Sequence, residues 1–567
     1  MKNVIEALSH WELLEIEKPA RYLGGEVNQA AAKESPALRT CLVFPDLYEL
    51  GMSNLALKIF YESLNQRPDI VAERAFSPWP DFESLLRRRG LPLYGLESGM
   101  PLKDFDVIFV TLPYEMTFTN VLNILDLAGL PLAWKNRNDG PIVIAGGPSA
   151  SNPLPVAKFM DAVLIGDGEE AIIEICDSLI ASKRAGANRS ETRQALTKVE
   201  GLWVPEFPGR VKRRVFKGFS QSQPPLKPVV PNVQAIHNRA PLEIFRGCMK
   251  GCRFCNAGFF YRPKRERPVE DLVKYAGDLL QSTGEESLGL LSLSTSDYNR
   301  LEDLIRSLDK AKLYPEQSVS IPSMRMNDNT IALLDATPHI RKGGLTFAPE
   351  AGTQRLRNVI NKNVTEEDII SVMKATGGSD YRTVKLYFMM GLPFETDEDI
   401  HGIVDLVKRL EAIGKTTKPR KQISISLSGF VPKPFTPFQW SEQASMSELR
   451  RKRQIVCRGL ERGSSRVSWR EEFLCLLESV LSRGDERVGE LIESAFRNGC
   501  KFDGWHEFFS KEKWEKAFAD TGIMAENYLR ARPLEEQLPW DFIDFQVPRA
   551  YLENEYRLAE QAAGEQA

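Results

Sequence analysis

Residues 244–260, IFRGCMKGCRFCNAGFF, contain three of the chain's eight cysteines. Cys248, Cys252 and Cys255 have the spacing Cys-x3-Cys-x2-Cys, and glycines stand between and beside them. Cysteine thiolates are the usual ligands of iron–sulfur clusters, and glycine allows a backbone to wrap closely around a bulky group. A [4Fe–4S] cluster has four irons, so three thiolates leave one iron open to an outside ligand. The spacing therefore predicts an open cluster that the amine and carboxylate of an amino acid could chelate.

A zinc site and a structural or fortuitous grouping are the alternatives for these cysteines. A zinc site would need a fourth ligand, but the nearest histidine, His237, lies 11 residues before Cys248, and no second ligand pair is present. The remaining cysteines are scattered through apolar patterns, which predicts buried thiols rather than disulfide bonds. They are Cys41, Cys176, Cys457, Cys475 and Cys500.

The composition is that of an ordinary globular protein. Of 567 residues, 27% are charged and 42% are hydrophobic, and the net charge of −3 gives the whole chain no general attraction to nucleic acid or anionic lipid. A chain of this length usually folds as several domains. No run of about 20 apolar residues occurs, so no membrane span is predicted. The N-terminus lacks the apolar region of a signal peptide, so we expect a cytoplasmic location.

Short apolar runs alternate with amphipathic helical patterns over residues 38–185. This alternation predicts βαβ units and a mainly parallel, Rossmann-like sheet, preceded by a helical extension over 1–37. Glycine-containing turns follow several of the strands, at the edge where such sheets bind ligands. The expected strands are 40–44, 107–110, 142–145 and 162–165, and the expected helices are 54–64, 117–127 and 169–179.

Residues 186–236 form the connection to the next domain. The segment 220–232, SQSQPPLKPVVPN, is rich in proline and serine, which predicts an extended linker. Before it, residues 201–205 and 211–216 are expected to pair as a hairpin.

The alternation resumes over residues 237–445, with six successive strand-and-helix units. This pattern predicts a partial (β/α)6 barrel of the TIM type, with its active site at the carboxyl ends of the strands. The cysteine segment directly follows the first strand, where an active site belongs. The expected strands are 242–246, 289–294, 319–322, 344–348, 384–389 and 423–428, and the expected helices are 270–281, 301–312, 365–374 and 398–410.

The strands are expected to stop after residue 440, and residues 446–567 are predicted to be a helical domain. The aromatic residues of 503–518, DGWHEFFSKEKWEKAF, recur near helical spacing, which predicts a face packed on a core.

Residues 241–440 resemble the radical S-adenosylmethionine (SAM) superfamily, whose signature is this cysteine spacing with an aromatic residue before the third cysteine. That aromatic residue is Phe254 here, and the resemblance implies that it lies near the adenine. The resemblance also implies that Ser296, in the turn 294–297, binds the methionyl amine. Arg325, in PSMRMND, is a candidate polar contact of the cofactor.

Three further motifs extend the resemblance along the barrel. Glu350, in FAPEAGTQRLR, would meet the ribose or the methionyl group, and Gly391, in MMGLPFET, belongs to a turn that packs on the adenosine. The segment 431–440, VPKPFTPFQW, would close the barrel.

The resemblance implies an enzyme that cleaves SAM to a 5′-deoxyadenosyl radical, with electrons from a flavodoxin- or ferredoxin-type donor. The substrate is not specified, and methylation or modification of an RNA or ribosomal component is one expectation. The basic segments 261–268 and 415–421 could serve such a substrate near the rim of the barrel, or could simply be solvated surface. The alternative function is a non-catalytic iron–sulfur redox sensor or electron-transfer protein.

Residues 38–185 resemble the cobalamin-binding domains that precede many such barrels. Those domains often carry Asp-x-His-x-x-Gly with a cobalt-ligating histidine, and the matching segment here, 46–51, has Tyr48 in place of that histidine. The resemblance places Thr111, Gly146 and Gly147 where the corrin tail is held. GDGEE, residues 166–170, matches the turn that ends the domain. Either cobalamin binds, with its cobalt unligated, water-ligated or contacted by the phenol of Tyr48, or the domain survives as a docking module without a corrin.

Overall fold

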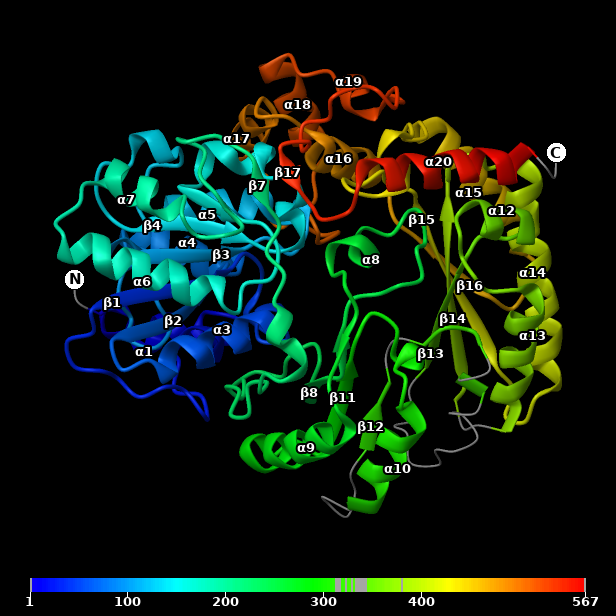
Figure 1. Cartoon of the computed structure of the whole chain (residues 1–567), viewed down its shortest axis with the longest axis horizontal. Coiled ribbons are helices and arrows are strands. Elements are labelled where there is room, and N and C mark those ends of the chain that lie inside the picture. The colour runs from blue at the N-terminus through cyan, green and yellow to red at the C-terminus, as the bar shows by residue number, and fades with distance from the viewer. Residues whose placement is uncertain are drawn as a thin grey trace.

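Three mainly parallel sheets of six, three and four strands form the framework of the computed structural model, with helices against their faces (Figure 1). The structure describes residues 3–311, 318–321, 324–327, 330–331, 344–378 and 381–564. None of the helices in these ranges is long and apolar enough to cross a membrane.

The N-terminal sheet has the strand order β2-β1-β3-β4-β5-β6, and only β6 runs antiparallel to its neighbour. The chain leaves β1 toward β2 on one side and then crosses to β3 on the other. Such a reversal opens a crevice at the carboxyl ends of the strands, which is the usual ligand site of an open α/β sheet. The strands are β1 (Leu38–Phe44), β2 (Ile70–Phe76), β3 (Val107–Thr111), β4 (Ile142–Gly146), β5 (Ala162–Leu164) and β6 (Leu202–Trp203). The helices of this part are α1 (His10–Leu14), α2 (Tyr48–Gly51), α3 (Leu55–Gln66), α4 (Pro80–Arg89), α5 (Phe118–Leu127), α6 (Ala171–Arg184) and α7 (Arg189–Leu196).

The strand β2 was not expected from the sequence, because Glu73 and Arg74 interrupt its apolar run. Both residues are buried, at 2% and 1% exposure. Arg74 forms ion pairs with Glu26 at 3.0 Å and with Glu97 at 2.6 Å. These partners lie far from β2 in the sequence, so no local pattern indicated that the charge of Arg74 would be compensated inside the protein.

The barrel consists of two parallel half-sheets, with strand orders β12-β11-β8 and β13-β14-β15-β16. All six expected strands are present, although position 322 of the third and position 312 of a neighbouring expected helix lie outside the described residues. The strands are β8 (Ala240–Glu243), β11 (Ser287–Leu291), β12 (Ser318–Ser320), β13 (Leu345–Glu350), β14 (Thr383–Met390) and β15 (Gln422–Gly429). The predicted order of a Rossmann-like sheet followed by a partial barrel is confirmed.

A seventh strand, β16 (Arg466–Trp469), pairs in parallel with β15. The expectation that strands stop after residue 440 is therefore wrong. This strand is short, and three of its four residues are exposed, so it has no apolar run to reveal it.

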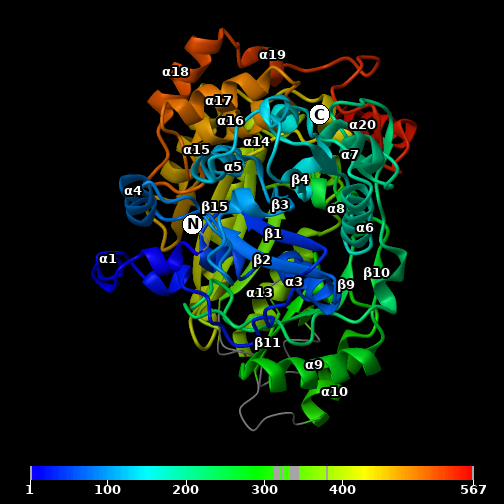
Figure 2. The same ribbon diagram turned by 90° about the vertical axis from the view of Figure 1, so that its left-hand side faces the viewer.

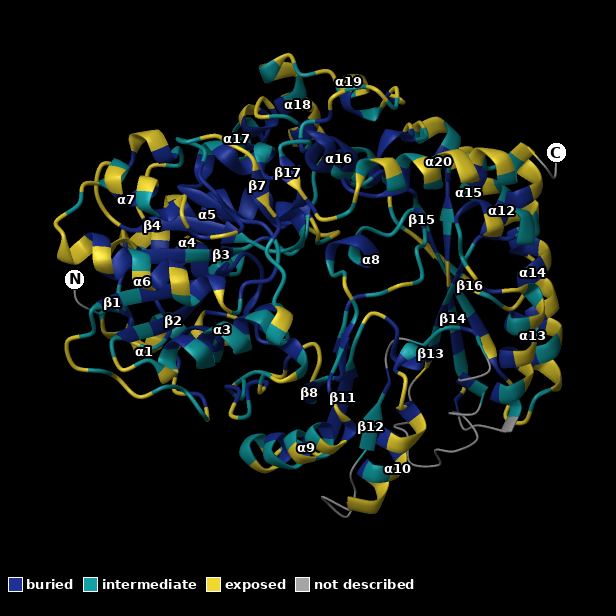
Figure 3. Cartoon of the chain, in the orientation of Figure 1, coloured by how far each residue is buried: buried dark blue, intermediate teal, exposed yellow. Residues whose placement is uncertain are grey.

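Helices cover the outer faces of both half-sheets (Figures 1 and 3). Along β14, Val384, Leu386 and Phe388 are buried in one apolar cluster with residues of the covering helices, whereas the residues between them are partly exposed. The helices are α9 (Val269–Thr283) and α10 (Leu301–Ala311) on the first half-sheet, and α13 (Glu366–Ala375), α14 (Asp397–Thr416) and α15 (Met446–Leu460) on the second.

The linker does not contain the expected hairpin. β6 pairs with β5 of the N-terminal sheet, and β7 (Val211–Lys212) pairs in parallel with β17 (Ile543–Asp544) near the C-terminus. Each of the two segments pairs with a strand that is distant in the sequence instead of with the other segment. The linker therefore contacts both the N-terminal sheet and the C-terminal part of the chain.

The C-terminal helices share an apolar core with the N-terminal sheet. Figures 1 and 2 show α17 (Val488–Arg497) beside α5, and residues of both helices belong to the largest apolar cluster. The aromatic segment 503–518 contributes Trp514, which is 1% exposed, while Trp505 contacts the ring of Trp79 edge-on at 5.5 Å. The other helices of this part are α16 (Glu472–Arg483), α18 (Lys511–Thr521), α19 (Glu526–Leu529) and α20 (Arg549–Gly564).

Replacement of Arg74 should strongly destabilise the N-terminal sheet. Arg74→Met would leave the buried carboxylates of Glu26 and Glu97 unpaired, at a cost of about 3–5 kcal/mol. Thermal unfolding followed by circular dichroism should show a midpoint lower by roughly 10 °C. Arg88→Met is the control, because Arg88 is 62% exposed and makes only a 4.0 Å contact with Glu15. Equal midpoints for the two variants would contradict the importance of this ion pair.

Candidate active site

The cysteine loop follows β8 and the two-residue strand β9 (Phe245–Arg246), and it leads into the short helix α8 (Asn256–Phe260). Gly247 starts the loop with φ of +91°, a conformation that side chains rarely adopt. A Cβ atom at this position would lie 2.5 Å from the carbonyl oxygen of Pro263 and 2.6 Å from that of Tyr261. Only glycine therefore fits here, and the sharp turn brings the three cysteines to the carboxyl end of the first barrel strand.

Two later segments hold the loop in place. The backbone N–H of Arg253 donates to the carbonyl oxygen of Ile360 at 3.0 Å, and its guanidinium pairs with Glu555 of α20 at 3.0 Å. The side chain of Asn361 donates to the carbonyl oxygen of Gly251 at 3.0 Å. The loop is thus clamped between the segment after α12 (Gln354–Val359) and the last helix of the chain.

The chemistry of the three thiols fits a metal cluster. All three are free, and burial raises the pKa of Cys255 to about 11, with the neighbouring Cys252 and Cys248 adding to the effect. Burial also raises the pKa of Cys252, while the cations Lys362 and Arg325 oppose that rise. The three sulfurs therefore lie close enough to influence one another, and bound iron would stabilise the thiolate forms that burial disfavours.

The same loop is not shaped as a single-ion site. In the described parts of the chain, no three His, Cys, Asp or Glu side chains are arranged to hold one metal ion. Ligands of a [4Fe–4S] cluster each bind a different iron, so they need not converge on one point. The donor set of Cys248, Cys252 and Cys255 suits such a cluster.

Glu350 ends β13 beside the cysteine loop, in a strained backbone conformation with φ of +68°. Burial raises the pKa of its carboxyl group, and the ammonium of Lys362, 3.3 Å away, opposes the rise. Lys362 also lies 6.0 Å from the centroid of the Phe254 ring. One lysine therefore connects Glu350, Phe254 and the cysteine loop. Lys362 was not expected from the sequence, because nothing in its local surroundings distinguishes it from a surface lysine.

Ser296 and Arg325 also meet near this loop. The backbone N–H of Arg325 donates to the hydroxyl of Ser296 at 3.0 Å, and Lys250 of the loop pairs with Asp297 at 3.0 Å. The other carboxylate oxygen of Asp297 and the hydroxyl of Ser294 are buried without a hydrogen-bond partner in the part of the chain that the structure describes. Unsatisfied buried polar atoms are costly, so this turn fits a ligand that carries a hydrogen-bonding group such as an amine.

Gly391 lies in the turn after β14, with φ of +76°. Its backbone N–H donates to Glu395 at 2.8 Å, and Glu395 pairs with Lys452 of α15 at 2.7 Å. The next residue, Leu392, belongs to an apolar cluster against which Phe254 packs. The turn is therefore fixed between α15 and the aromatic residue of the cysteine loop, and a role of Gly391 in cofactor binding stays a prediction.

A cavity of about 490 Å³ lies between the N-terminal sheet and the barrel. Thr111, Gly146 and Gly147 line it at the carboxyl ends of β3 and β4, and Gly247 and the segment 292–293 line it on the barrel side. Most of its wall is apolar. The fold therefore brings three of the four expected cobalamin contacts together, next to the start of the cysteine loop.

Tyr48 lies outside this cavity, which corrects the expectation that it faces the cofactor. Its hydroxyl donates to Glu26 at 3.0 Å and accepts from the backbone N–H of Asn232 at 3.0 Å. Its ring is 1% exposed and contacts Phe76 edge-on at 5.2 Å. The side chain of Tyr48 points inward because Glu26, which also pairs with Arg74, is a buried hydrogen-bond acceptor for the Tyr48 hydroxyl.

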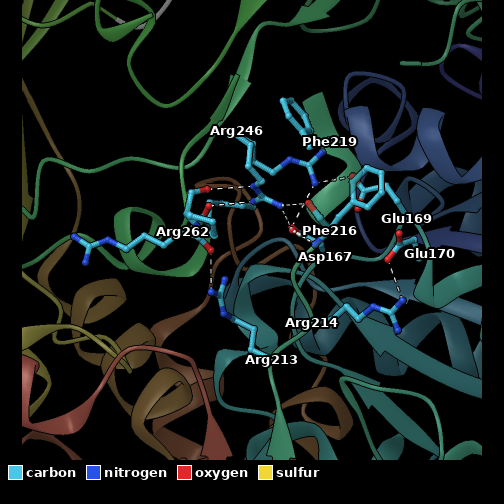
Figure 4. A network of polar contacts seen from close by, with 12 residues as sticks. Asp167, Glu169, Glu170, Arg213, Arg214, Phe216, Phe219, Arg246 and Arg262 are labelled. Carbon is cyan, nitrogen blue, oxygen red and sulfur yellow. Dashed lines mark hydrogen bonds and ion pairs between the residues drawn. The ribbon is translucent and has the colours of Figure 1, made fainter. Parts of the chain in front are cut away.

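A buried ion network joins the N-terminal sheet to the barrel beside the cavity (Figure 4). Arg246 pairs with Glu169 at 2.6 Å and with Asp167 at 3.4 Å, and Asp167 also pairs with Arg265 at 2.6 Å. Burial disfavours the charge of Asp167, but the two guanidinium groups hold its pKa below the usual value. Figure 4 shows Phe219 beside Arg246, whose guanidinium is 5.0 Å from the ring centroid.

Two arginines of the basic segment 261–268 are buried at this network. Arg265 and Arg267 are buried, at 8% and 4% exposure, so they serve the contact between domains instead of a surface patch. The other basic segment, 415–421, lies between α14 and the start of β15. It is therefore at the amino ends of the strands, opposite the cysteine loop, and the expectation that it borders the rim is wrong.

Comparisons with known proteins agree with this arrangement. Residues 242–407 match the family model described as the radical SAM superfamily, and residues 56–205 match the one described as radical SAM proteins, N-terminal. An uncharacterized protein of Methanocaldococcus jannaschii is 28% identical over 85% of this chain and 97% of its own length. A tRNA-2-methylthio-N(6)-dimethylallyladenosine synthase of Petrotoga mobilis is 23% identical, over 34% of this chain and 46% of its own length.

Among solved structures, the radical SAM methyltransferase TsrM from Kitasatospora setae, with cobalamin and a [4Fe–4S] cluster bound, superposes with a TM-score of 0.50. The match covers 71% of this chain and 77% of that one at 13% identity, which indicates a shared fold. With the family match across the barrel and the three cysteines at the carboxyl end of its first strand, this chain belongs to the radical SAM superfamily.

Proposed function

We propose that this protein is a radical SAM enzyme whose cluster is held by Cys248, Cys252 and Cys255. The observation that carries the proposal is the group of three free, partly buried thiols, clamped at the carboxyl end of β8 beside Lys362 and Glu350. When bound, the cluster and SAM supply a 5′-deoxyadenosyl radical that can remove hydrogen from a substrate. The protein itself positions the reactants and excludes water.

The side chains around the loop have separate roles in this proposal. The turn that contains Ser296 would receive the methionyl amine, because Ser294 and Asp297 keep buried polar atoms there without a partner among the described residues. Glu350, restrained by Lys362, would accept a hydrogen bond from the ribose or methionyl group. Phe254 would pack against the adenine, in the apolar cluster that contains the turn after β14.

Arg325 and Gly391 would complete the pocket. Arg325 is fixed by its backbone contact with Ser296, and Gly391 lies in the turn next to Leu392, which shares the apolar cluster with Phe254.

An RNA or ribosomal component is the substrate class that we propose, with a flavodoxin- or ferredoxin-type protein as electron donor. The similarity of part of this chain to a tRNA-modifying synthase supports an RNA substrate. Methyl transfer is the reaction type that the methyltransferase of the same fold suggests.

We propose further that the cavity beside the loop binds cobalamin without a protein imidazole ligand. Thr111, Gly146 and Gly147 line this cavity, and the methyltransferase of the same fold has cobalamin bound. None of the described residues that line the cavity is a histidine. Gly146 and Gly147 would let the ring system approach the strand ends closely.

Replacement of the loop cysteines should remove the cluster. Alanine at Cys248, Cys252 or Cys255 should abolish iron binding after anaerobic reconstitution, whereas the wild type should bind about four irons and four sulfides. Alanine at Cys41 or Cys500, both buried in apolar clusters, is the matched control and should leave the iron content unchanged. An essential role of either control cysteine in iron binding would contradict the open three-thiolate site.

With dithionite, the wild type should produce 5′-deoxyadenosine from SAM. An intact cluster without this product would favour the redox-sensor alternative.

Glu350→Gln should weaken SAM binding about tenfold while the iron content stays unchanged, because it removes the charged acceptor that Glu350, held by Lys362, would present to SAM. Equilibrium dialysis of SAM against the reconstituted protein measures the first effect, and iron analysis measures the second. Glu515→Gln, on the exposed face of α18, is the control. Loss of iron in the Glu350 variant would show that this residue supports the cluster instead.

Tyr48→Phe should leave cobalamin binding unchanged and lower the thermal stability, because Tyr48 donates its hydroxyl to Glu26 outside the cavity. Gly146→Val, at the cavity wall, should reduce the corrinoid retained after desalting. Electron paramagnetic resonance of the Co(II) form should show no splitting from an axial imidazole nitrogen. Protein that stays colourless after incubation with hydroxocobalamin would instead indicate a docking module without a corrin.

A further inference from the structure

The inner face of the second half-sheet is polar. Along β14 and β15, every second residue is buried against α13, α14 and α15, and the residues between them point to the opposite face. Figure 1 shows that this face looks toward β8, β11 and β12 of the other half-sheet. The side chains on it include Lys385, Tyr387, Ser424, Ser426, Arg466 and Ser468.

The strand register aligns three of these residues in one row. Lys385 of β14 pairs with Ser424 of β15, and Ser424 pairs with Arg466 of β16. Neighbouring strands lie about 4.8 Å apart, so the two long cationic side chains start roughly 10 Å from each other, with a hydroxyl between them. Lysine and arginine side chains of this length can converge on one group above Ser424.

Neither cation has a carboxylate partner in the part of the chain that the structure describes. Lys385 lies over the ring of Tyr387, 4.8 Å from its centroid, and Arg466 is exposed. Lys433, by contrast, pairs with Glu115 at 2.8 Å and with Glu478 at 2.7 Å. The row therefore carries two positive charges that no carboxylate of the described residues pairs with.

The row lies on the same face as the proposed cofactor pocket but deeper in the barrel. Met389, four residues beyond Lys385 along β14, packs with Phe254 in one apolar cluster. A strand rises about 3.3 Å per residue, so Lys385 lies roughly 13 Å before Met389 along β14. A group held at the row would extend the rest of its molecule toward the cysteine loop.

We propose that Lys385, Ser424 and Arg466 hold a phosphate group of the substrate. Arginine binds phosphate through its planar fork, lysine through a point charge, and a serine hydroxyl can donate between them. Three donors from three strands match the three peripheral oxygens of a phosphoryl group better than the two oxygens of a carboxylate. The proposal rests on the proposed function and specifies its substrate as a phosphate-bearing molecule, bound on the inner face of β14, β15 and β16.

Inorganic phosphate is the probe for this site. Equilibrium dialysis of labelled phosphate at low salt should show binding to the reconstituted full-length protein. Lys385→Met and Arg466→Gln should each weaken that binding about tenfold, since each removes one charge-assisted hydrogen bond. Lys408→Met and Arg458→Gln are matched controls, because both residues are exposed on the outer helices α14 and α15, and they should bind phosphate as the wild type does.

The outcomes separate this proposal from the proposed function. Unchanged phosphate binding in both inner-face variants, with normal iron content as a check on folding, would overturn the site. Acetate binding as tight as phosphate binding would overturn the assignment to phosphate. If the wild type fails to cleave SAM but phosphate binding depends on Lys385 and Arg466, the proposed function fails while the anion site stands.

Discussion

The guanidinium of Arg246, two residues before the first cysteine of the loop, lies between Glu169 of the turn after β5 and Glu243 of β8, at 2.6 and 3.0 Å. A buried charge of this kind is tolerated only with partners of opposite charge, and removal of one partner costs several kcal/mol. The contact between the N-terminal domain and the barrel and the position of the cysteine loop therefore both depend on the side chain of Arg246. The cavity lies against this network, so its shape follows from the same ion pairs.

The last part of the chain completes the site that the first parts begin. Glu555 of α20 binds Arg253 of the cysteine loop, and β17 pairs with the linker strand β7. The C-terminal helices also share their apolar core with the N-terminal sheet. The loop is consequently held by two segments that are far apart in sequence, the residues after α12 and the helix α20, which gives the rigid support that a preorganised reaction site requires.

The barrel interior has two chemically different regions. Near the cysteine loop, Phe254 packs with Met389 and Leu392, which suits an adenosyl group with an apolar face. Deeper in the barrel, hydroxyl groups and two cations without carboxylate partners among the described residues line the strands β14 to β16. Such a gradient would orient a substrate with its anionic end away from the cofactor.

The sequence alone determined the cysteine loop, the six barrel strands and the parallel N-terminal sheet, because residue spacing and apolar periodicity are local signals. Only the tertiary structure decided the strand with Arg74, the inward turn of Tyr48, the position of Lys362 beside Glu350 and the burial of Arg265. Each of these depends on a partner distant in the sequence: Glu26 for Arg74 and Tyr48, the strained end of β13 for Lys362, and Asp167 for Arg265. A charged or polar residue is buried only where such a partner compensates the cost of leaving water, and its own neighbours in the chain do not show whether that partner exists.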